Sequence, residues 1–192
     1  MQTHRITRLF IVILSLNTLM SQRVVGYYPD WVRYEFPPVY LDLDVLTHVI
    51  HAFGWPDVNG NIMSYDNMFN ISNSGIIHKK FLLSLGGWGQ DEGFVAVSAS
   101  SELRQTFINN LLDVCDEYEY DGVDLDWEFP QSVSDRNNLN LLVLTYYYIL
   151  LFWKNQCDLR HVWLMFLHDY KGETPEQGYY GLFRQSDGFR YR

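Results

Sequence analysis

Four carboxylic acids lie within eight residues of one short segment, YDGVDLDWEFP, which spans residues 120–130. The acids are Asp121, Asp124, Asp126 and Glu128, and the residues between them include valine, leucine and tryptophan, which usually pack in protein cores. Successive side chains of a strand point to opposite faces, so Asp124, Asp126 and Glu128 are expected to share one face. Asp121 has the other parity. A row of acids on a buried strand is typical of a catalytic site.

The electrostatics of this row favour an acid that keeps its proton. Neighbouring carboxylates at strand spacing are about 6.8 Å apart, and at an effective dielectric constant of about 20 they repel by roughly 2.4 kcal/mol. That repulsion corresponds to about two pKa units, so one acid is expected to stay protonated near neutral pH, as a general acid must. Glu128, at the end of the strand, is best placed to reach a substrate.

Two other interpretations of the acids remain open from the residues alone. A pair of aspartates could hold magnesium, and a network of buried acids could be structural. A calcium loop fits less well, because its ligands come from a turn and not from a strand with apolar residues between the acids. His48 and His51 are expected on opposite faces of a strand, which favours packed or hydrogen-bonded histidines over a shared metal.

The elements that must position the acids alternate between strands and helices. Short apolar runs that end in glycine, proline or a loop predict four buried strands, at 23–28, 46–53, 81–87 and 121–127. A helix between the last two is predicted from a serine cap at Ser100 or Ser101 and an apolar stripe of helical period: Leu103, Phe107, Leu111, Cys115 and Tyr118. A helical crossover implies parallel strands, which places the acids at carboxyl ends, where α/β folds carry their chemistry. Residues 162–167, VWLMFL, are a candidate fifth strand.

The amino-acid composition limits the classes of protein to which the chain can belong. The chain has 192 residues, 47% of them hydrophobic and 17% aromatic, which is enough apolar material for one compact domain. The formal net charge of −9 argues against partners such as nucleic acid or anionic membrane surfaces, which require basic patches. Cys115 and Cys157 could pair in an oxidising compartment, but a buried free thiol is favoured for Cys115 because it falls on the apolar stripe.

The first 22 residues read as a secretory signal peptide. Arg5 and Arg8 precede the apolar run LFIVILSLNTLM, which is too short to span a bilayer comfortably. Cleavage is expected near Ser21 or Gln22, with a short signal anchor or a buried first helix as the alternatives. Secretion is therefore predicted, with no membrane attachment after removal of the signal. Asn70 begins an Asn-Ile-Ser glycosylation sequon, which agrees with an extracellular location.

Several motifs together resemble glycoside hydrolase family 18, the chitinases and chitinase-like lectins. The segment DGVDLDWE resembles the family's DxxDxDxE signature, and SLGGW at 84–88 resembles its SxGG motif. VVGYY at 24–28 with Trp31, and THVIHAF at 47–53, resemble its first two strands. The acidic motif is highly specific, and the resemblance covers roughly residues 24–143.

The resemblance implies a (β/α)8 barrel that hydrolyses β-1,4-linked N-acetylglucosamine with retention and needs no cofactor or metal. By resemblance, Glu128 protonates the glycosidic oxygen, Asp126 orients the substrate's acetamido group, which attacks the anomeric carbon, and Asp124 holds Asp126. Asp121 is expected to give structural support. The residues implied to line the sugar cleft are Tyr27, Phe53, Trp88 and Phe129, with Gly86 and Gly87 allowing close backbone approach. A place in the barrel core is an equal alternative for Phe53.

The resemblance does not extend over the whole chain. We expect an α/β fold of the TIM-barrel type that comprises about the first four or five βα units. The predicted organisation is a signal peptide at 1–22, the N-terminal half of the catalytic barrel at 23–143 and a divergent tail at 144–192. One hypothesis is that the chain is a truncated or misassembled product: a fragment, an alternative splice form or a faulty gene model.

Three functions compete at this point. The first is a secreted chitinase-type hydrolase acting on chitin or chito-oligosaccharides, which the presence of Glu128 favours. The second is a non-catalytic glycan-binding lectin or an inactive fragment, which the missing later strands favour. The third is a magnesium-dependent barrel enzyme that uses the aspartate row and loses activity in EDTA. Oligomeric state has no signal in the sequence.

Overall fold

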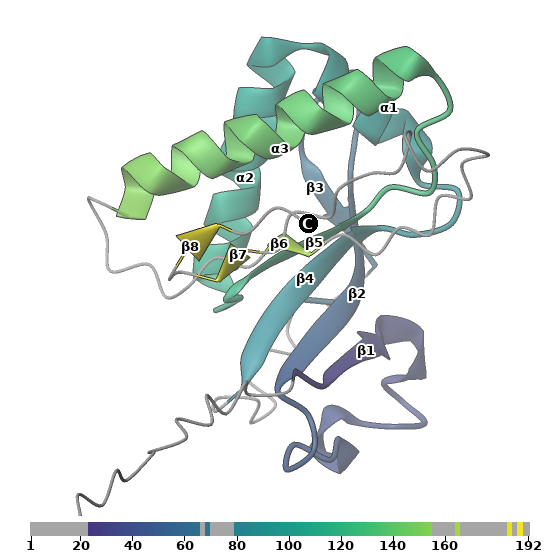
Figure 1. Cartoon of the computed structure of the whole chain (residues 1–192). Coiled ribbons are helices and arrows are strands. Elements are labelled where there is room, and N and C mark those ends of the chain that lie inside the picture. Colours follow the sequence, from purple (N-terminus) through teal and green to yellow (C-terminus); the bar gives the residue numbers. More distant parts are fainter. Residues whose placement is uncertain are drawn as a thin grey trace, which may run out of the picture.

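The computed structural model describes residues 23–65, 68–69 and 79–154, together with the backbone of three short strands nearer the carboxyl end (Figure 1). Side chains are described as far as Ile149. The predicted signal peptide, the sequon at Asn70 and Cys157 lie outside the described residues. The interpretations attached to them therefore stay predictions.

A mainly parallel sheet forms the centre of the described chain. Across the sheet its strands follow the order β1 (Val25–Pro29), β2 (His48–Pro56), β4 (Lys80–Gly86), β5 (Gly122–Asp126) and β6 (Leu164–Met165). Each neighbouring pair in this order is parallel. The predicted α/β class with parallel strands is therefore confirmed.

The four predicted strands are present with ends that differ by a few residues, and β6 falls within the candidate fifth strand. The sheet also contains a strand that was not predicted, β3 (Ile62–Ser64), which pairs antiparallel with the end of β2. Three residues are too few to show a strand period. The turn before β3 is held by Asp57, whose Oδ1 accepts the backbone N–H groups of Asn59 and Asn61 at 2.8 Å. A further antiparallel pair joins β7 (Arg184–Gln185) and β8 (Gly188–Phe189).

Three helices gather on one side of the sheet: α1 (Asp91–Ala99), α2 (Ser101–Glu117) and α3 (Val133–Lys154) (Figure 1). The predicted helix is α2, and its cap is Ser100, whose Oγ accepts the N–H of Leu103 at 3.3 Å. The separate helix α1 was not predicted. It ends where Ser100 adopts an extended backbone, with φ −106° and ψ 130°, and this break divides α1 from α2.

The helix α3 was not predicted, because its apolar residues have no clear period. Leu142, Val143 and Tyr146 are buried, whereas Leu144 and Tyr148 are exposed large side chains on the same helix. The helix continues across position 143, and the domain boundary predicted there stays a prediction. Among the described residues, no helix has both the length and the apolar character that a membrane crossing demands.

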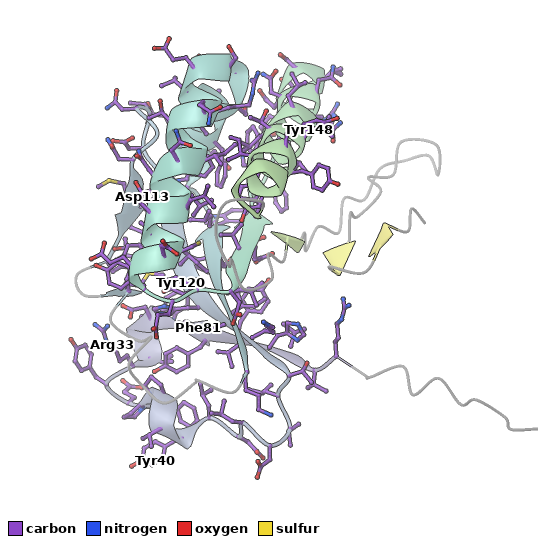
Figure 2. All side chains as sticks on the ribbon, turned by 90° about the vertical axis from the view of Figure 1, so that its left-hand side faces the viewer. Arg33, Tyr40, Phe81, Asp113, Tyr120 and Tyr148 are labelled. Atoms are coloured by element: carbon purple, nitrogen blue, oxygen red, sulfur yellow. The ribbon has the colours of Figure 1, made fainter. Side chains whose placement is uncertain are left out.

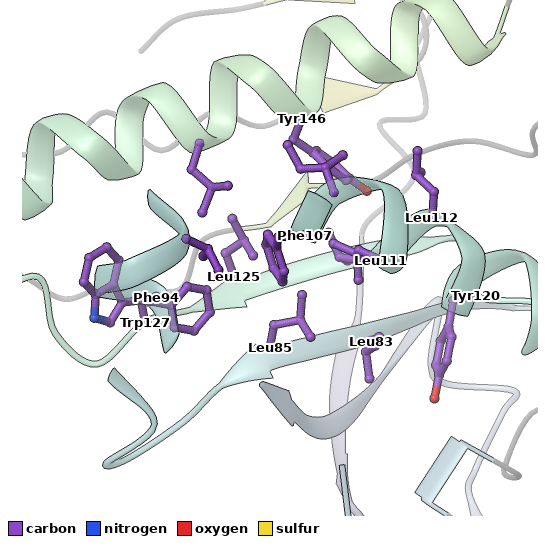
Figure 3. Close-up of a cluster of buried hydrophobic side chains, with 14 of the residues drawn as sticks. Leu83, Leu85, Phe94, Phe107, Leu111, Leu112, Tyr120, Leu125, Trp127 and Tyr146 are labelled. Carbon is purple, nitrogen blue, oxygen red and sulfur yellow. The ribbon is translucent and has the colours of Figure 1, made fainter. Parts of the chain in front are cut away.

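The core lies between the sheet and the helices (Figure 3). From β4, β5 and the residue after β5, alternate side chains enter it: Leu83, Leu85, Val123, Leu125 and Trp127. From the helices come Phe94, Phe107, Leu111 and Tyr146, all buried. Each fully buried side chain of this kind contributes about 1.5–3 kcal/mol relative to an exposed one. Cys115 is a free thiol that packs partly buried against this core, which agrees with the favoured interpretation.

Both histidines of β2 are hydrogen-bonded, as predicted. His51 is buried, and its Nδ1 lies 2.8 Å from the hydroxyl of Tyr120. Tyr120 in turn stacks on Phe81 at a ring distance of 4.6 Å, near the lower end of α2 in Figure 2. Burial lowers the pKa of His51 to about 3, so the ring is neutral. The Nδ1 of His48 lies 2.8 Å from the hydroxyl of Thr47.

Candidate active site

The acids of the DGVDLDWE segment meet groups from two other strands at the inner face of the sheet. In register, Ser84 of β4 lies opposite Asp124, and Gly86 lies opposite Asp126. Tyr27 reaches the same place from β1, which is 97 positions away from Asp124 in the sequence. The site is therefore assembled from the carboxyl halves of three parallel strands, which is where α/β folds bring side chains together.

Asp124 is the most enclosed acid of the row, with 0% of its surface exposed. Its Oδ2 accepts hydrogen bonds from the hydroxyl of Ser84 at 2.7 Å and from the hydroxyl of Tyr27 at 2.8 Å. Burial raises its pKa to about 6, and these two donors hold the pKa below the value that burial alone would give. Asp124 is thus fixed in place by two donors from neighbouring strands.

Asp126 is the acid with the higher pKa of the two. Burial comes first among the causes, followed by the negative charges of Asp124 and Glu128 and a hydrogen bond with Glu128, and together they raise its pKa to about 7. The expectation that the acidic row is not fully ionised near neutral pH is met at this position. Near neutral pH, Asp126 can therefore hold a proton or share it with Asp124 or Glu128.

Tyr27 stays protonated beside these acids. Burial, and then the charge of Asp124, raise the pKa of its hydroxyl above the ordinary value for tyrosine. The hydroxyl is thus a permanent donor to Asp124, while 37% of the Tyr27 side chain remains exposed. Tyr27 was predicted to line a sugar cleft, and its contact with Asp124 was not foreseen.

Glu128 lies just beyond the end of β5 and is half-buried. Asp124 and Asp126, by contrast, are buried. A group from solution can therefore approach Glu128 more readily than the other two acids. This placement agrees with the expectation that Glu128 is the acid best placed to reach a substrate.

Asp121 lies at the other end of the segment and is separate from the row. Its Oδ1 pairs with Lys80 Nζ at 2.7 Å, and its Oδ2 accepts the backbone N–H of Phe81 at 3.0 Å. Asp121 thus ties the start of β4 to the residue before β5. This contact is of the structural kind expected from its different parity.

The two glycines at the end of β4 have backbone conformations that other residues avoid. Gly86 has φ 122° and Gly87 has φ 82°. A Cβ atom added to Gly86 would collide with the carbonyl oxygen of Asp126, and one added to Gly87 would lie 3.1 Å from the ring of Phe53. The N–H of Gly87 also donates to that Asp126 carbonyl at 2.9 Å. The glycines therefore bring the chain close to the acidic strand.

Two pairs of aromatic rings lie near the acidic row. Trp88 is 84% exposed, and its ring meets that of Phe129 edge-on at 6.5 Å. Phe53 is half-buried and stacks on Trp31 at 6.2 Å. Phe53 is thus not enclosed in the core, which was its alternative interpretation. Trp31, 61% exposed, was not among the predicted lining residues, although it directly follows the first strand and its turn.

A metal centre was kept open as an alternative for the acids. Within the described ranges, no group of three or more histidine, cysteine, aspartate or glutamate side chains is arranged to hold a metal ion. The oxygen Oδ2 of Asp124 is already occupied by two hydroxyl donors.

The fold and this site define a protein of the (β/α)-barrel type with buried acids on the strand β5. The sequence profile of the family described as "Glycosyl hydrolases family 18" matches residues 23–155. The match covers well over half of the chain, and the chain belongs to glycosyl hydrolases family 18.

Curated relatives agree with this assignment. A class V chitinase of Medicago truncatula is 33% identical over 122 residues, which cover 59% of this chain and 32% of the relative. A probable endochitinase of Caenorhabditis elegans is 28% identical over 140 residues, which cover 61% of this chain and 22% of the relative. The chain therefore spans a third or less of the length of these two relatives.

Solved structures show the same fold. A chitinase of the family from Cycas revoluta, in complex with (GlcNAc)3, superposes with a TM-score of 0.72 at 20% identity and covers 80% of this chain and 48% of that one. A class V chitinase from Nicotiana tobaccum gives a TM-score of 0.68 at 20% identity, covering 74% and 43%. At these identities the likeness concerns the fold alone. The described α/β sheet corresponds to part of a TIM barrel, as predicted.

Proposed function

We propose that this protein is a chitinase-type glycoside hydrolase that cleaves β-1,4-linked N-acetylglucosamine polymers. The observation that carries the proposal is the buried acidic row, in which Tyr27 donates to Asp124 and the charge of Asp124 and a hydrogen bond with Glu128 act on Asp126. Support comes from relatives named as chitinases and from a structural neighbour solved with (GlcNAc)3. The chain spans less than half of those proteins, so its activity is a proposal that needs a direct experiment.

In the proposed reaction, Glu128 donates its proton to the glycosidic oxygen as the bond to the anomeric carbon breaks. The acetamido oxygen of the same sugar attacks that carbon and forms a cyclic intermediate. Asp126 orients the acetamido group and stabilises the charge that develops on it, in a site where little water competes. Water then opens the intermediate with Glu128 as the base, which returns the proton to Glu128 and retains the configuration.

Asp124 and Tyr27 support Asp126 in this scheme. An Asp126 with a pKa of about 7 can exchange its proton with Asp124 or Glu128 as charge develops on the substrate. The hydroxyls of Tyr27 and Ser84 stabilise the negative charge of Asp124 when the proton lies elsewhere. The scheme uses no metal ion, so EDTA is expected to leave the rate unchanged.

Exposed aromatic rings are proposed to bind the sugar units. Trp88, Phe129 and Tyr27 flank the acids, and Trp31 with Phe53 extends the aromatic surface from β1 and β2. The apolar faces of pyranose rings stack on such side chains. A second candidate, a glycan-binding lectin, needs only this surface.

The test is the hydrolysis of a fluorogenic chito-oligosaccharide by the full chain beside Glu128→Gln. Release by the wild type that falls by about a hundredfold or more in the variant supports the hydrolase, since general acid catalysis contributes about 10²–10⁴-fold. Binding to chitin beads without release from either protein identifies the lectin. Loss of activity in EDTA would contradict this mechanism and favour the magnesium-dependent enzyme.

We also propose that the protein is secreted after removal of residues 1–22. The basic and apolar pattern of that segment supports the proposal. Expression in a secreting eukaryotic cell, followed by N-terminal sequencing of protein from the medium, is expected to give a start near Arg23. A product that stays cell-associated with an intact N-terminus contradicts it.

A further inference from the structure

Asp91 is an acid close to the site that the proposed mechanism does not use. It is the first residue of α1 and follows the loop that carries Gly87 and Trp88. Its Oδ1 is buried and has no regular hydrogen-bond partner among the described residues, and the same holds for the indole Nε1 of Trp127. A buried acceptor and a buried donor without partners are each unfavourable, so a pairing between them is physically expected.

The two side chains do act on each other. Burial raises the pKa of Asp91, the indole N–H of Trp127 lowers it, and the charge of Glu128 raises it further. The same pairing is indicated by geometry, because both unpaired atoms are buried and the ring of Trp127 packs on α1 through Phe94. No regular hydrogen bond joins the Oδ1 of Asp91 to the indole Nε1 of Trp127 in this structure. Hydrogen bonds in active sites are often long without substrate and tighten when it binds.

The surroundings of Trp127 leave it little freedom. Its ring is 3% exposed and stacks on Phe94 of α1, with centroids 5.5 Å apart and planes at 11°. Figure 3 shows the two rings side by side at one end of the core. The ring of Phe94 also lies close to Gly86, since a Cβ added there would come within 3.2 Å of it. The start of α1, the end of β4 and the residue before Glu128 thus form one packed unit.

Asp91 has an adjacent acid for comparison. Glu92, on the same turn of α1, is exposed, whereas Asp91 is half-buried with one oxygen turned into the protein. Both acids complement the positive end of the helix dipole, so the dipole alone does not explain the inward direction of Asp91.

We propose that Asp91 is a positioning residue for Glu128. It holds the indole of Trp127, and because Glu128 is the next residue, it limits where the carboxyl of Glu128 can lie. The inference rests on the proposed function, since it assigns Glu128 the role of proton donor. Asp91 itself touches no reacting atom.

The test compares Asp91→Ala and Asp91→Asn with the control Glu92→Gln in the full chain. The first readout needs no activity: the indole N–H resonance of Trp127, identified with Trp127→Phe, and the backbone amide resonance of Glu128. Both resonances are expected to move in Asp91→Ala and to stay in place in Glu92→Gln. The Asn variant keeps an acceptor oxygen and is expected to restore the wild-type positions in part. Thermal unfolding of each variant shows whether it is folded.

The second readout is turnover of the chito-oligosaccharide. Asp91→Ala is expected to lower kcat by roughly ten- to a hundredfold with a small change in KM, because a displaced acid affects the reaction more than binding. Asp91→Asn is expected to recover part of kcat, and Glu92→Gln to match the wild type.

The two readouts separate this inference from the proposed function. Resonances that do not respond to Asp91→Ala overturn the inference, whatever the turnover. If the resonances move in Asp91→Ala but the wild type shows no turnover, the contact is supported and the proposed hydrolase is contradicted. If the resonances move in Asp91→Ala but its kcat is unchanged, the positioning role is overturned. If Asp91→Ala does not fold, Asp91→Asn decides: resonances and kcat between those of the wild type and a full loss support the inference, and values equal to the wild type overturn it.

Discussion

The two faces of β4 and β5 have opposite chemistry, although their residues alternate along the same strands. Leu83, Leu85 and Leu125 enter an apolar core beneath the helices. On the inner face, Ser84 and Asp124 form buried hydrogen bonds. The outer face stabilises the fold, and the inner face holds acids whose charged forms burial disfavours. These strands are thus held in place by one face, and the other face can carry groups that are unfavourable when buried.

Gly86→Ala is expected to have the largest effect, because Gly86 is where the end of β4 touches the acidic strand. A Cβ there would collide with the Asp126 carbonyl oxygen, and φ 122° is unfavourable for alanine. We expect a loss of roughly 3–5 kcal/mol in the free energy of unfolding, from strain and overpacking together. Urea denaturation measures it. Gly89→Ala is the control, since Gly89 also has positive φ but open space around it. Equal losses in the two variants would contradict the collision.

Leu85→Ala beside Ser84→Ala tests the two faces directly. Leu85 is 0% exposed, so its truncation is expected to lower the free energy of unfolding by about 2–5 kcal/mol. Ser84→Ala removes one donor to Asp124 and is expected to lose about 1–3 kcal/mol. Turnover per folded molecule should fall in Ser84→Ala and stay near wild type in Leu85→Ala. The reverse pattern would contradict the division between the faces.

The inner face also predicts how stability depends on pH. In the folded chain the pKa of Asp126 is about 7 and that of Asp124 about 6, whereas unfolded aspartates titrate near pH 4. The folded state therefore binds more protons between about pH 4 and 7, and the free energy of unfolding contributed by these acids falls as pH rises through that window. Asp126→Asn is expected to make this dependence shallower by a few kcal/mol, at about 1.4 kcal/mol per pKa unit. Urea denaturation at several pH values checks it, and an unchanged slope would be evidence against a raised pKa at Asp126.

The smallest expected effect lies on the helical side. Ser100→Ala removes the hydroxyl that caps α2 and is expected to lower the free energy of unfolding by about 1 kcal/mol, with turnover unchanged. Ser101→Ala is the matched control, because its hydroxyl is not the cap. Thermal unfolding of both variants distinguishes them, and similar midpoints would argue against Ser100 as the cap.

Much of this architecture was predictable because it depends on local periodicity. The two-residue alternation of DGVDLDW predicts both faces of β5, and the stripe after Ser101 predicts α2. The elements that were not predicted lack such a period. The helix α1 is nine residues long, and α3 has apolar residues on its buried and exposed sides alike. The roles assigned to Glu128 and Asp126 stay predictions.

The sequence by itself determined the order of strands and helices, the acidic row and the family, because each is encoded by neighbouring residues. Only the tertiary structure decided which distant groups meet that row. Tyr27 donates to Asp124 across 97 positions, and Phe94 of α1 stacks on Trp127, the residue before Glu128. It also decided that Asp126 holds a proton up to about pH 7, because burial and neighbouring charges set a pKa. The meeting of distant groups and the pKa of Asp126 both depend on distances in space, which strand pairing and core packing determine.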